Sequence, residues 1–148
     1  MDERIARLAT PEGCERFVKN AVRLNRLDLA LKARIRAVEL RAEAYGSTSQ
    51  AEKECIQAVF AQEEVLTINN RLKRKRSRSW QAIRRLGIVP AAERAMNGTT
   101  EVEYPALLAI GLQEFALEAV ILRHPDVFSV EAVQRSQTRM TEWAALAE

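Results

Sequence analysis

Apolar residues recur at steps of three and four along most of this chain, and that spacing limits what it can fold into. The clearest run lies between residues 27 and 45 and consists of Leu27, Leu31, Ile35, Val38, Ala42 and Tyr45. Such a period places one apolar stripe along an α-helix, whereas a half-buried strand needs alternation with a period of two. No repeated alternation of Val, Ile, Thr and Tyr bounded by turns is present. The sequence therefore predicts an all-α fold.

Helix start and stop signals divide the chain into about seven expected helices. Thr10-Pro11 combines an N-cap residue with proline at the first helical position, and Ser49 with Glu52 forms a capping box. Isolated glycines and Asn-rich steps mark several of the ends. The expected helices span about residues 11–25, 28–45, 50–69, 80–86, 90–97, 105–124 and 130 onward, the sixth bent near Gly111.

The length of the chain predicts one domain. A chain of 148 residues can enclose a hydrophobic core without disulfides or metals. We expect residues 1–148 to form a single compact helical domain, with a basic loop and a short helix near the middle. Possible sub-units within it are N-terminal helices at 1–70, a basic loop with a helix-turn-helix-like pair at 71–98, and C-terminal helices at 99–148.

Several features predict a soluble cytoplasmic protein that does not enter a membrane. Two cysteines, Cys14 and Cys55, are too few for a disulfide framework and fall on apolar helix faces, so we expect free thiols in the core. The N-terminus is charged where a signal peptide needs an apolar run. The uncharged run at 104–113 is about half a bilayer span. Residues 73–76 also fit a simple nuclear-import pattern, which applies if the source is eukaryotic.

The sequence lacks the residues that most catalytic and metal sites require, so we expect no enzymatic activity, no cofactor and no metal site. His124 is the only histidine, and no glycine-rich phosphate loop is present. We expect the His124 ring to close a helix by binding its last carbonyls, and an enzyme would need a pocket around it with Asp126 or Glu118. Carboxylates such as Glu63 and Glu64 are interpreted as solvated surface residues, and the side chains of this adjacent pair are expected to point in different directions.

Positive charge is concentrated near the middle of the chain. Residues 71–80 read Arg-Leu-Lys-Arg-Lys-Arg-Ser-Arg-Ser-Trp, and the interval 65–92 holds eight cations and no acid. The other 15 of the 23 cations face 20 acids, so the rest of the chain carries a net charge of −5. A basic island in an otherwise acidic protein favours an anionic partner over general solubility.

The short helix after this island is amphipathic. Trp80, Ala82, Ile83 and Leu86 share one half of its wheel, and Gln81, Arg84 and Arg85 share the other. Trp80 is interpreted as a buried anchor, with stacking on a base as the alternative. The backbone N–H groups around Ser79 are expected to be free to donate to phosphates.

We therefore expect a non-enzymatic nucleic-acid-binding protein, a regulator or accessory subunit that contacts DNA more readily than RNA and in its duplex form. The expected contacts are Arg71, Lys73, Arg74, Lys75, Arg76, Ser77, Arg78, Ser79, Gln81, Arg84 and Arg85.

Two other interpretations of the island remain open. In one, the protein is an interaction or oligomeric adaptor whose basic island meets an acidic partner surface. A homodimer of this kind could use Phe115, Leu117 and Trp143 as spare apolar surface. In the other, the island is a solvated loop with no specific partner.

Overall fold

The helical periodicity of the sequence is reproduced in three dimensions. The computed structural model describes residues 2–98 and 101–147, and within these ranges it contains nine α-helices, one short 3₁₀-helix and no strand. The elements are α1 (Glu3–Ala6), α2 (Pro11–Arg23), α3 (Leu27–Tyr45), α4 (Gln50–Asn69), α5 (Ser79–Leu86), α6 (Ile88–Asn97), α7 (Tyr104–Ala109), η1 (Gln113–Phe115), α8 (Leu117–Arg123) and α9 (Val130–Ala147). The predicted all-α fold is confirmed. No helix in these ranges carries an apolar run long enough to span a bilayer.

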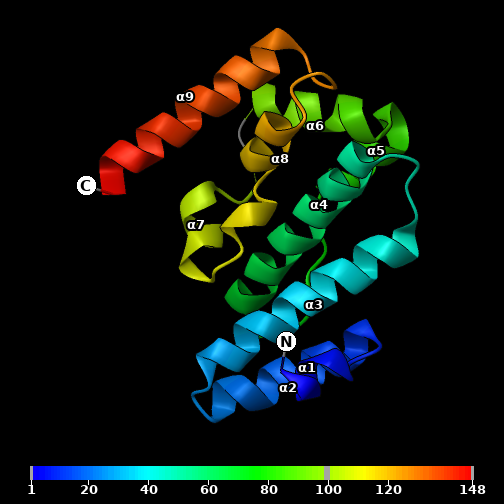
Figure 1. The fold of residues 1–148 in the computed structure, drawn as a ribbon, viewed down its shortest axis with the longest axis vertical. Coiled ribbons are helices and arrows are strands. Elements are labelled where there is room, and N and C mark those ends of the chain that lie inside the picture. Colours follow the sequence, from blue (N-terminus) through cyan, green and yellow to red (C-terminus); the bar gives the residue numbers. More distant parts are fainter. Residues whose placement is uncertain (1, 99–100, 148) are drawn as a thin grey trace.

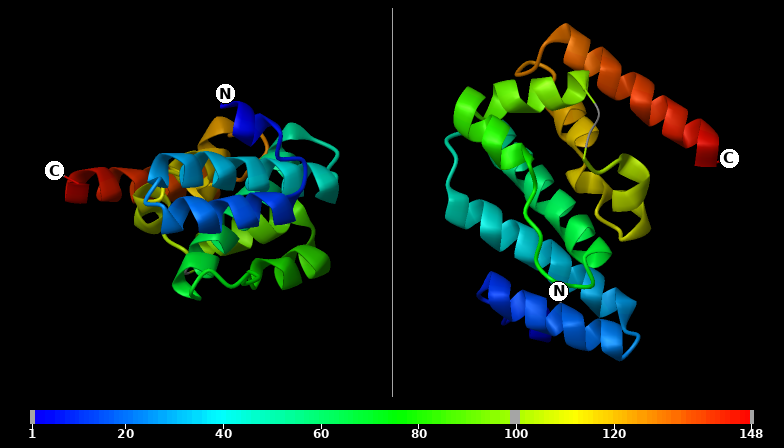
Figure 2. Two further views of the ribbon diagram at one scale, coloured as in Figure 1. Left: turned by 90° about the horizontal axis from the view of Figure 1, so that it is seen from below. Right: turned by 180° about the vertical axis from the view of Figure 1, so that it is seen from behind.

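Helix α4 is the central element (Figure 1). It packs against α3 on one side and against α6, α7 and α8 on others, so it joins helices from all three of the expected sub-units. The α2–α3 hairpin lies at one end of the molecule and α9 at the other, an arrangement that the right-hand view of Figure 2 also shows. Small buried residues such as Ala58 and Ala61 let neighbouring helices approach α4 closely. Residues buried around its whole circumference, rather than along one stripe, are typical of a helix in a core.

The segment from residue 105 to 124 is broken rather than bent. Helix α7 ends in a Schellman pattern, in which the Leu112 N–H donates to the Leu107 carbonyl at 2.9 Å. Gly111 takes the left-handed position of this pattern, with a φ of +79°. The turn buries Leu112 completely and lets the η1 and α8 segments start in new directions. A continuous helix was expected because the apolar spacing continues through the break.

Two other boundaries differ from the sequence prediction. The four-residue helix α1 was not anticipated; it buries Ile5, and the Arg4 N–H in its first turn donates to the Asp2 carboxylate. Helix α6 begins at Ile88 rather than at Pro90. Proline lacks a backbone N–H, and it is tolerated in the first turn because the N–H groups of that turn have no intrahelical partner. One residue, Gly87, therefore separates α5 from α6, fewer than the three or four in the turn of a helix-turn-helix motif.

The structure shows where the side chains expected at a dimer surface, and the two cysteines expected in the core, lie. Leu117 is buried in the main core, and the Trp143 ring stacks on Tyr104 with 5.0 Å between ring centroids. Leu117 is therefore not available as surface, whereas Phe115 and Trp143 are half-buried. Cys14 and Cys55 are buried free thiols, as expected, and burial raises the pKa of both, that of Cys55 to about 12.

The break at Gly111 gives a test of the fold. A Cβ on Gly111 would lie 2.8 Å from the Leu31 Cδ atoms, whereas one on Gly46, which also has positive φ, would meet nothing within 4 Å. We expect Gly46→Ala to cost about 1 kcal/mol through backbone strain alone. Gly111→Ala should cost about 1 kcal/mol more in urea unfolding, because Leu31 must change rotamer. In a Leu31→Ala background this difference should disappear; if it persists, the contact with Leu31 is not its cause.

Candidate nucleic-acid interface

The chain reverses direction where α4 ends, and this reversal sets the path of the basic segment, defined as residues 71–78. The Leu72 N–H donates to the Thr67 carbonyl at 2.9 Å and the Arg71 N–H to the Ile68 carbonyl at 3.2 Å, which is again a Schellman pattern. Arg71 and Leu72 adopt positive φ angles of 58° and 64°, which strain a residue other than glycine by about 1–2 kcal/mol each. The basic segment then runs back along α4 to the start of α5 (Figure 2).

A buried carboxylate on α4 holds the basic segment in place. Glu63 is 1% exposed and accepts three kinds of donor. The Ser77 backbone N–H and the Trp80 indole N–H each donate to Glu63 Oε2 at 2.7 Å, and the Arg74 guanidinium pairs with Oε1. Hydrogen bonds to a carboxylate are stronger than those between neutral groups, and burial excludes competing water. The basic segment and α5 are therefore attached to α4 by the same side chain.

Arg74 extends this cluster to a second carboxylate. Its Nη1 lies 3.0 Å from Glu64 Oε2, and its Nε lies 3.8 Å from Glu15 on α2, which also pairs with Arg41 of α3 at 2.7 Å. Burial raises the pKa of Glu64, and the positive charges of Arg74 and Arg41 oppose that rise. Both Glu63 and Glu64 are buried and both meet Arg74, so the prediction that they are solvated and point apart is wrong. The prediction considered only partners along the same helix, whereas Arg74, which pairs with both acids, comes from the loop that follows α4.

Glu101, an acid outside the Glu63 cluster, binds the start of α5. Its Oε1 accepts from the Ser77 hydroxyl at 2.7 Å, and its Oε2 pairs with the Arg78 Nε at 3.0 Å. The Arg78 backbone N–H also points to Glu101, and the Ser79 N–H donates to the Ser77 hydroxyl at 3.0 Å. The N–H groups of Ser77, Arg78 and Ser79, which were expected to donate to phosphates, thus have acceptors inside the protein. Ser77 is buried and Ser79 half-buried, which suits them to positioning the helix.

Trp80 lies in the core, as its interpretation as an anchor expects. It is 6% exposed, and its ring stacks on Tyr45 and packs at 4.9 Å against Phe60. The guanidinium of Arg76 lies 5.8 Å from the centre of the ring, a distance at which cation–π attraction operates. Because both neighbours and the indole hydrogen bond come from the protein, the ring is closed to a nucleic-acid base.

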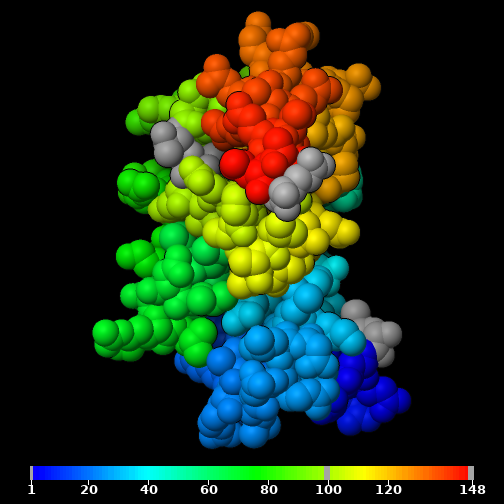
Figure 3. All heavy atoms as spheres, turned by 90° about the vertical axis from the view of Figure 1, so that its left-hand side faces the viewer, coloured from blue at the N-terminus to red at the C-terminus, as the bar shows by residue number. Residues whose placement is uncertain are grey.

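The other predicted contacts remain on the surface. Six of the eight cations between residues 65 and 92 are exposed and form no ion pair with any acid in residues 2–98 or 101–147. Four lie on the basic segment and two on α5, beside the exposed amide of Gln81. These cations are Arg71, Lys73, Lys75, Arg76, Arg84 and Arg85. We call them, together with Gln81, the cationic face. In the space-filling view, the green part of the chain that contains it forms the left-hand edge of the molecule (Figure 3).

The acids that organise the cationic face were missed in the sequence, although one signal pointed to them. Ile56, Val59 and Glu63 follow the spacing of one helix face, so Glu63 falls on the buried side of α4. A carboxylate there must find donors, and the nearby acid-free stretch offers them. No comparable local signal marks Glu101, since its partners lie 23 and 24 positions away in the sequence.

His124 binds a carboxylate rather than the carbonyls of its own helix, which corrects the expectation from sequence. Its Nε2 lies 2.9 Å from Glu54 Oε2 on α4, and Arg123 Nε lies 2.7 Å from Glu54 Oε1. Burial would raise the pKa of Glu54, but hydrogen bonds from His124, Gln50 and Arg123 outweigh it and hold the pKa below its ordinary value. Glu118, considered as a catalytic partner, pairs instead with Arg139.

Comparison with known proteins gives no family to which this arrangement belongs. No protein-family model matches the sequence, and neither a curated protein nor a solved structure shows significant similarity to it. In the described ranges, no three His, Cys, Asp or Glu side chains gather as possible ligands of a metal ion. The function is therefore inferred from the cationic face and its supports.

The Glu63 cluster is open to a direct test of stability. Glu63→Gln replaces a carboxylate oxygen with a donor amide that faces Arg74, Ser77 and Trp80. Breaking a buried ion pair by removing one partner typically costs about 3–5 kcal/mol, so we expect a loss of about 3 kcal/mol in urea unfolding. Glu39→Gln is the matched control, because Glu39 is exposed on α3. Equal stability of the two variants would contradict the role given to Glu63.

The Glu54 cluster predicts a dependence of stability on pH. Because the pKa of Glu54 is lower in the folded protein than its ordinary value of 4.5, its ionised form stabilises the fold above that pH. This contribution is lost as the pH falls through the folded pKa. Glu54→Gln should therefore lower the free energy of unfolding by about 1–3 kcal/mol at pH values near neutrality. The deficit should shrink in unfolding series taken below about pH 4.5; a deficit independent of pH would oppose this account.

Proposed function

We propose that the protein is a non-enzymatic nucleic-acid-binding protein that contacts duplex DNA through its cationic face, as a regulator or accessory subunit. One observation carries the proposal: the fold pairs Arg74 and Arg78 with its own acids but leaves the other six cations of the same stretch exposed on adjoining elements. Like charges gathered without counter-charges repel one another, and an anionic polymer relieves that repulsion.

The arrangement of the cationic face suits a phosphate backbone. Each Lys or Arg that neutralises a phosphate releases counterions, so several together give strong, salt-sensitive binding. On α5, Arg84 and Arg85 follow Gln81 by three and four positions, so the three exposed side chains lie on one side of the helix. Arg and Gln are side chains that hydrogen-bond base edges in a major groove, which supports a duplex as the ligand.

Ion pairs and hydrogen bonds within the protein give the remaining predicted contacts a different task. Arg74, Ser77, Arg78 and Ser79 hold the basic segment and the start of α5 through Glu63 and Glu101. A binding loop ordered before its ligand arrives loses less conformational entropy on binding. We therefore assign these four residues to positioning and the residues of the cationic face to contact.

The proposal predicts how salt affects binding. Affinity for a labelled duplex of about 20 base pairs, followed by fluorescence anisotropy, should fall steeply as salt rises. Exchanging Lys73, Lys75 and Arg76 for Gln should reduce the slope of log affinity against log salt by roughly 2–3, since about one counterion is released per phosphate contact. The effect should appear on duplexes of unrelated sequence, because phosphate contacts carry no sequence information.

A matched control separates this effect from a change in net charge. Arg16, Arg23 and Lys32 are exposed cations on α2 and α3, outside the basic segment and α5. Exchanging these three for Gln removes the same charge and should leave the slope nearly unchanged. Equal losses in both triple variants, or affinity that ignores salt, would refute the cationic face as the binding site. A constitutive oligomer whose mass by light scattering ignores both DNA and the Lys73, Lys75 and Arg76 exchanges would instead favour an acidic protein partner or a second copy.

A further inference from the structure

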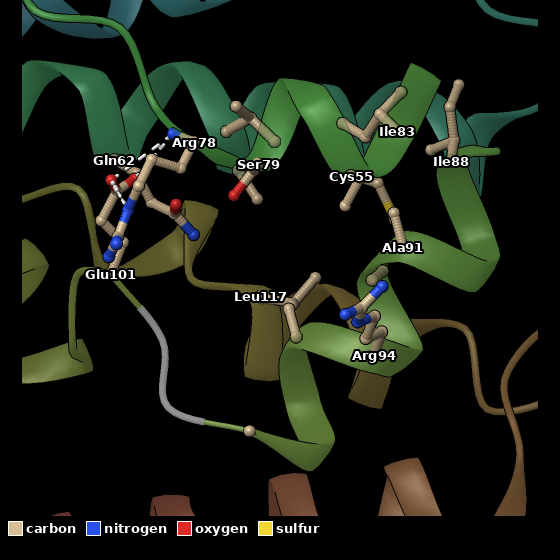
Figure 4. A pocket seen from close by; sticks show the side chains of 16 residues that line it. Cys55, Gln62, Arg78, Ser79, Ile83, Ile88, Ala91, Arg94, Glu101 and Leu117 are labelled. Carbon is tan, nitrogen blue, oxygen red and sulfur yellow. Dashed lines mark hydrogen bonds and ion pairs between the residues drawn. The ribbon is translucent and has the colours of Figure 1, made fainter. Parts of the chain in front are cut away.

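A cavity of about 420 Å³ lies on the inner side of α5, opposite the cationic face (Figure 4). Its walls come from α4, α5, α6, the first residue of α8 and the segments just before α5 and just after α6. Much of the lining is apolar and includes Cys55, Val59, Ile83, Ile88, Ala91 and Leu117. The volume falls within the range of about 300–1,000 Å³ that is usual for small-molecule sites. Neither His124 nor the Glu54 cluster contributes to the lining.

One buried oxygen in the cavity wall accepts no hydrogen bond from the part of the chain that the structure describes. Gln62 of α4 is 7% exposed, and its Oε1 is buried without a donor in residues 2–98 or 101–147. Leaving such an acceptor unpaired costs about 1–3 kcal/mol, and so it is uncommon in a folded protein. Gln62 lies at the polar end of the cavity, near Arg78, Ser79 and Glu101 (Figure 4). A ligand that carries a hydroxyl or N–H group would supply the missing donor.

The cavity lining also contains one cation that is not paired within the described chain. Arg78 is neutralised by Glu101, whereas Arg94 of α6 forms no ion pair with an acid in residues 2–98 or 101–147. Arg94 is exposed, so its guanidinium can meet both the cavity and solvent. A guanidinium in this position favours a carboxylate, which it can bind through two parallel hydrogen bonds.

We propose that this cavity binds a small amphipathic organic acid: an apolar body with a carboxylate for Arg94 and a hydrogen-bond donor for Gln62. The apolar lining supplies most of the driving force by removing the body of the ligand from water. The two polar groups fix its orientation. The proposal does not depend on nucleic-acid binding, because it uses the opposite side of α5.

Three related probes distinguish the parts of the proposed site. They are a hydroxynaphthoate with its two polar groups at opposite ends of the fused rings, naphthoate without the hydroxyl group, and naphthol without the carboxylate. Isothermal titration calorimetry with the full chain should show the hydroxynaphthoate binding most tightly. Each simpler probe should bind roughly tenfold more weakly, the effect of one lost polar contact.

Variants assign each contact to a residue. Gln62→Leu should weaken the hydroxynaphthoate roughly tenfold and leave naphthoate unchanged, since only the donor contact is lost. Arg94→Gln should weaken both acids and leave naphthol unchanged. Ala82→Phe, which fills the cavity from α5, should abolish binding of all three, whereas Ala109→Phe on exposed α7 should not. Circular dichroism checks that each variant is folded.

Two results would overturn the proposal. One is the absence of heat from all three probes at millimolar concentration with the folded original chain. The other is unchanged binding of the hydroxynaphthoate in folded Gln62→Leu and Arg94→Gln. If Ala82→Phe does not fold, Ala82→Leu replaces it, and full retention of binding in that variant would count against the cavity as well.

Discussion

The buried carboxylate of Glu63 is the constraint on which the middle of this structure depends. An ionised group taken out of water must be met by several donors, or it destabilises the fold. Here the donors are Arg74, the Ser77 N–H and the indole of Trp80, which come from the basic segment and from α5. Satisfying one side chain of α4 therefore fixes the path of a loop that has no regular secondary structure. It also fixes the rotation of the short helix that follows.

That constraint separates two sets of cations that look alike in the sequence. Arg74 pairs with Glu63 and Glu64, and Arg78 pairs with Glu101. These ion pairs fix the basic segment and the start of α5 in position. The other six cations of the stretch are exposed and form no ion pair in the described ranges. The basic island is thus partly neutralised by the protein itself, which weakens the inference that all of its charge serves an external partner. The charge that remains exposed is what the proposed nucleic-acid interface requires, and it is displayed on a loop already held in position.

Helix α5 has two sides with different chemical environments. Gln81, Arg84 and Arg85 face solvent, while Ala82 and Ile83 face a cavity between α5, α4 and α6. A short amphipathic helix normally buries its apolar side completely. In this protein part of that side lines the cavity, and beside it lies the Gln62 Oε1, which accepts no hydrogen bond from the described residues. The proposed ligand site and the proposed nucleic-acid interface therefore use opposite sides of one helix.

The sequence by itself determined the all-α fold, most of the longer helices, and the division of α5 into a basic side and a side anchored by Trp80. These features follow from the apolar period and from caps, and both act within about four residues along the chain. Only the tertiary structure decided which acids meet the basic segment, since Glu101 and Arg78 lie 23 positions apart. It also decided the break at Gly111, where Leu31 of α3 packs, and the cavity at Gln62. Such features depend on packing between distant elements, which helical periodicity does not specify.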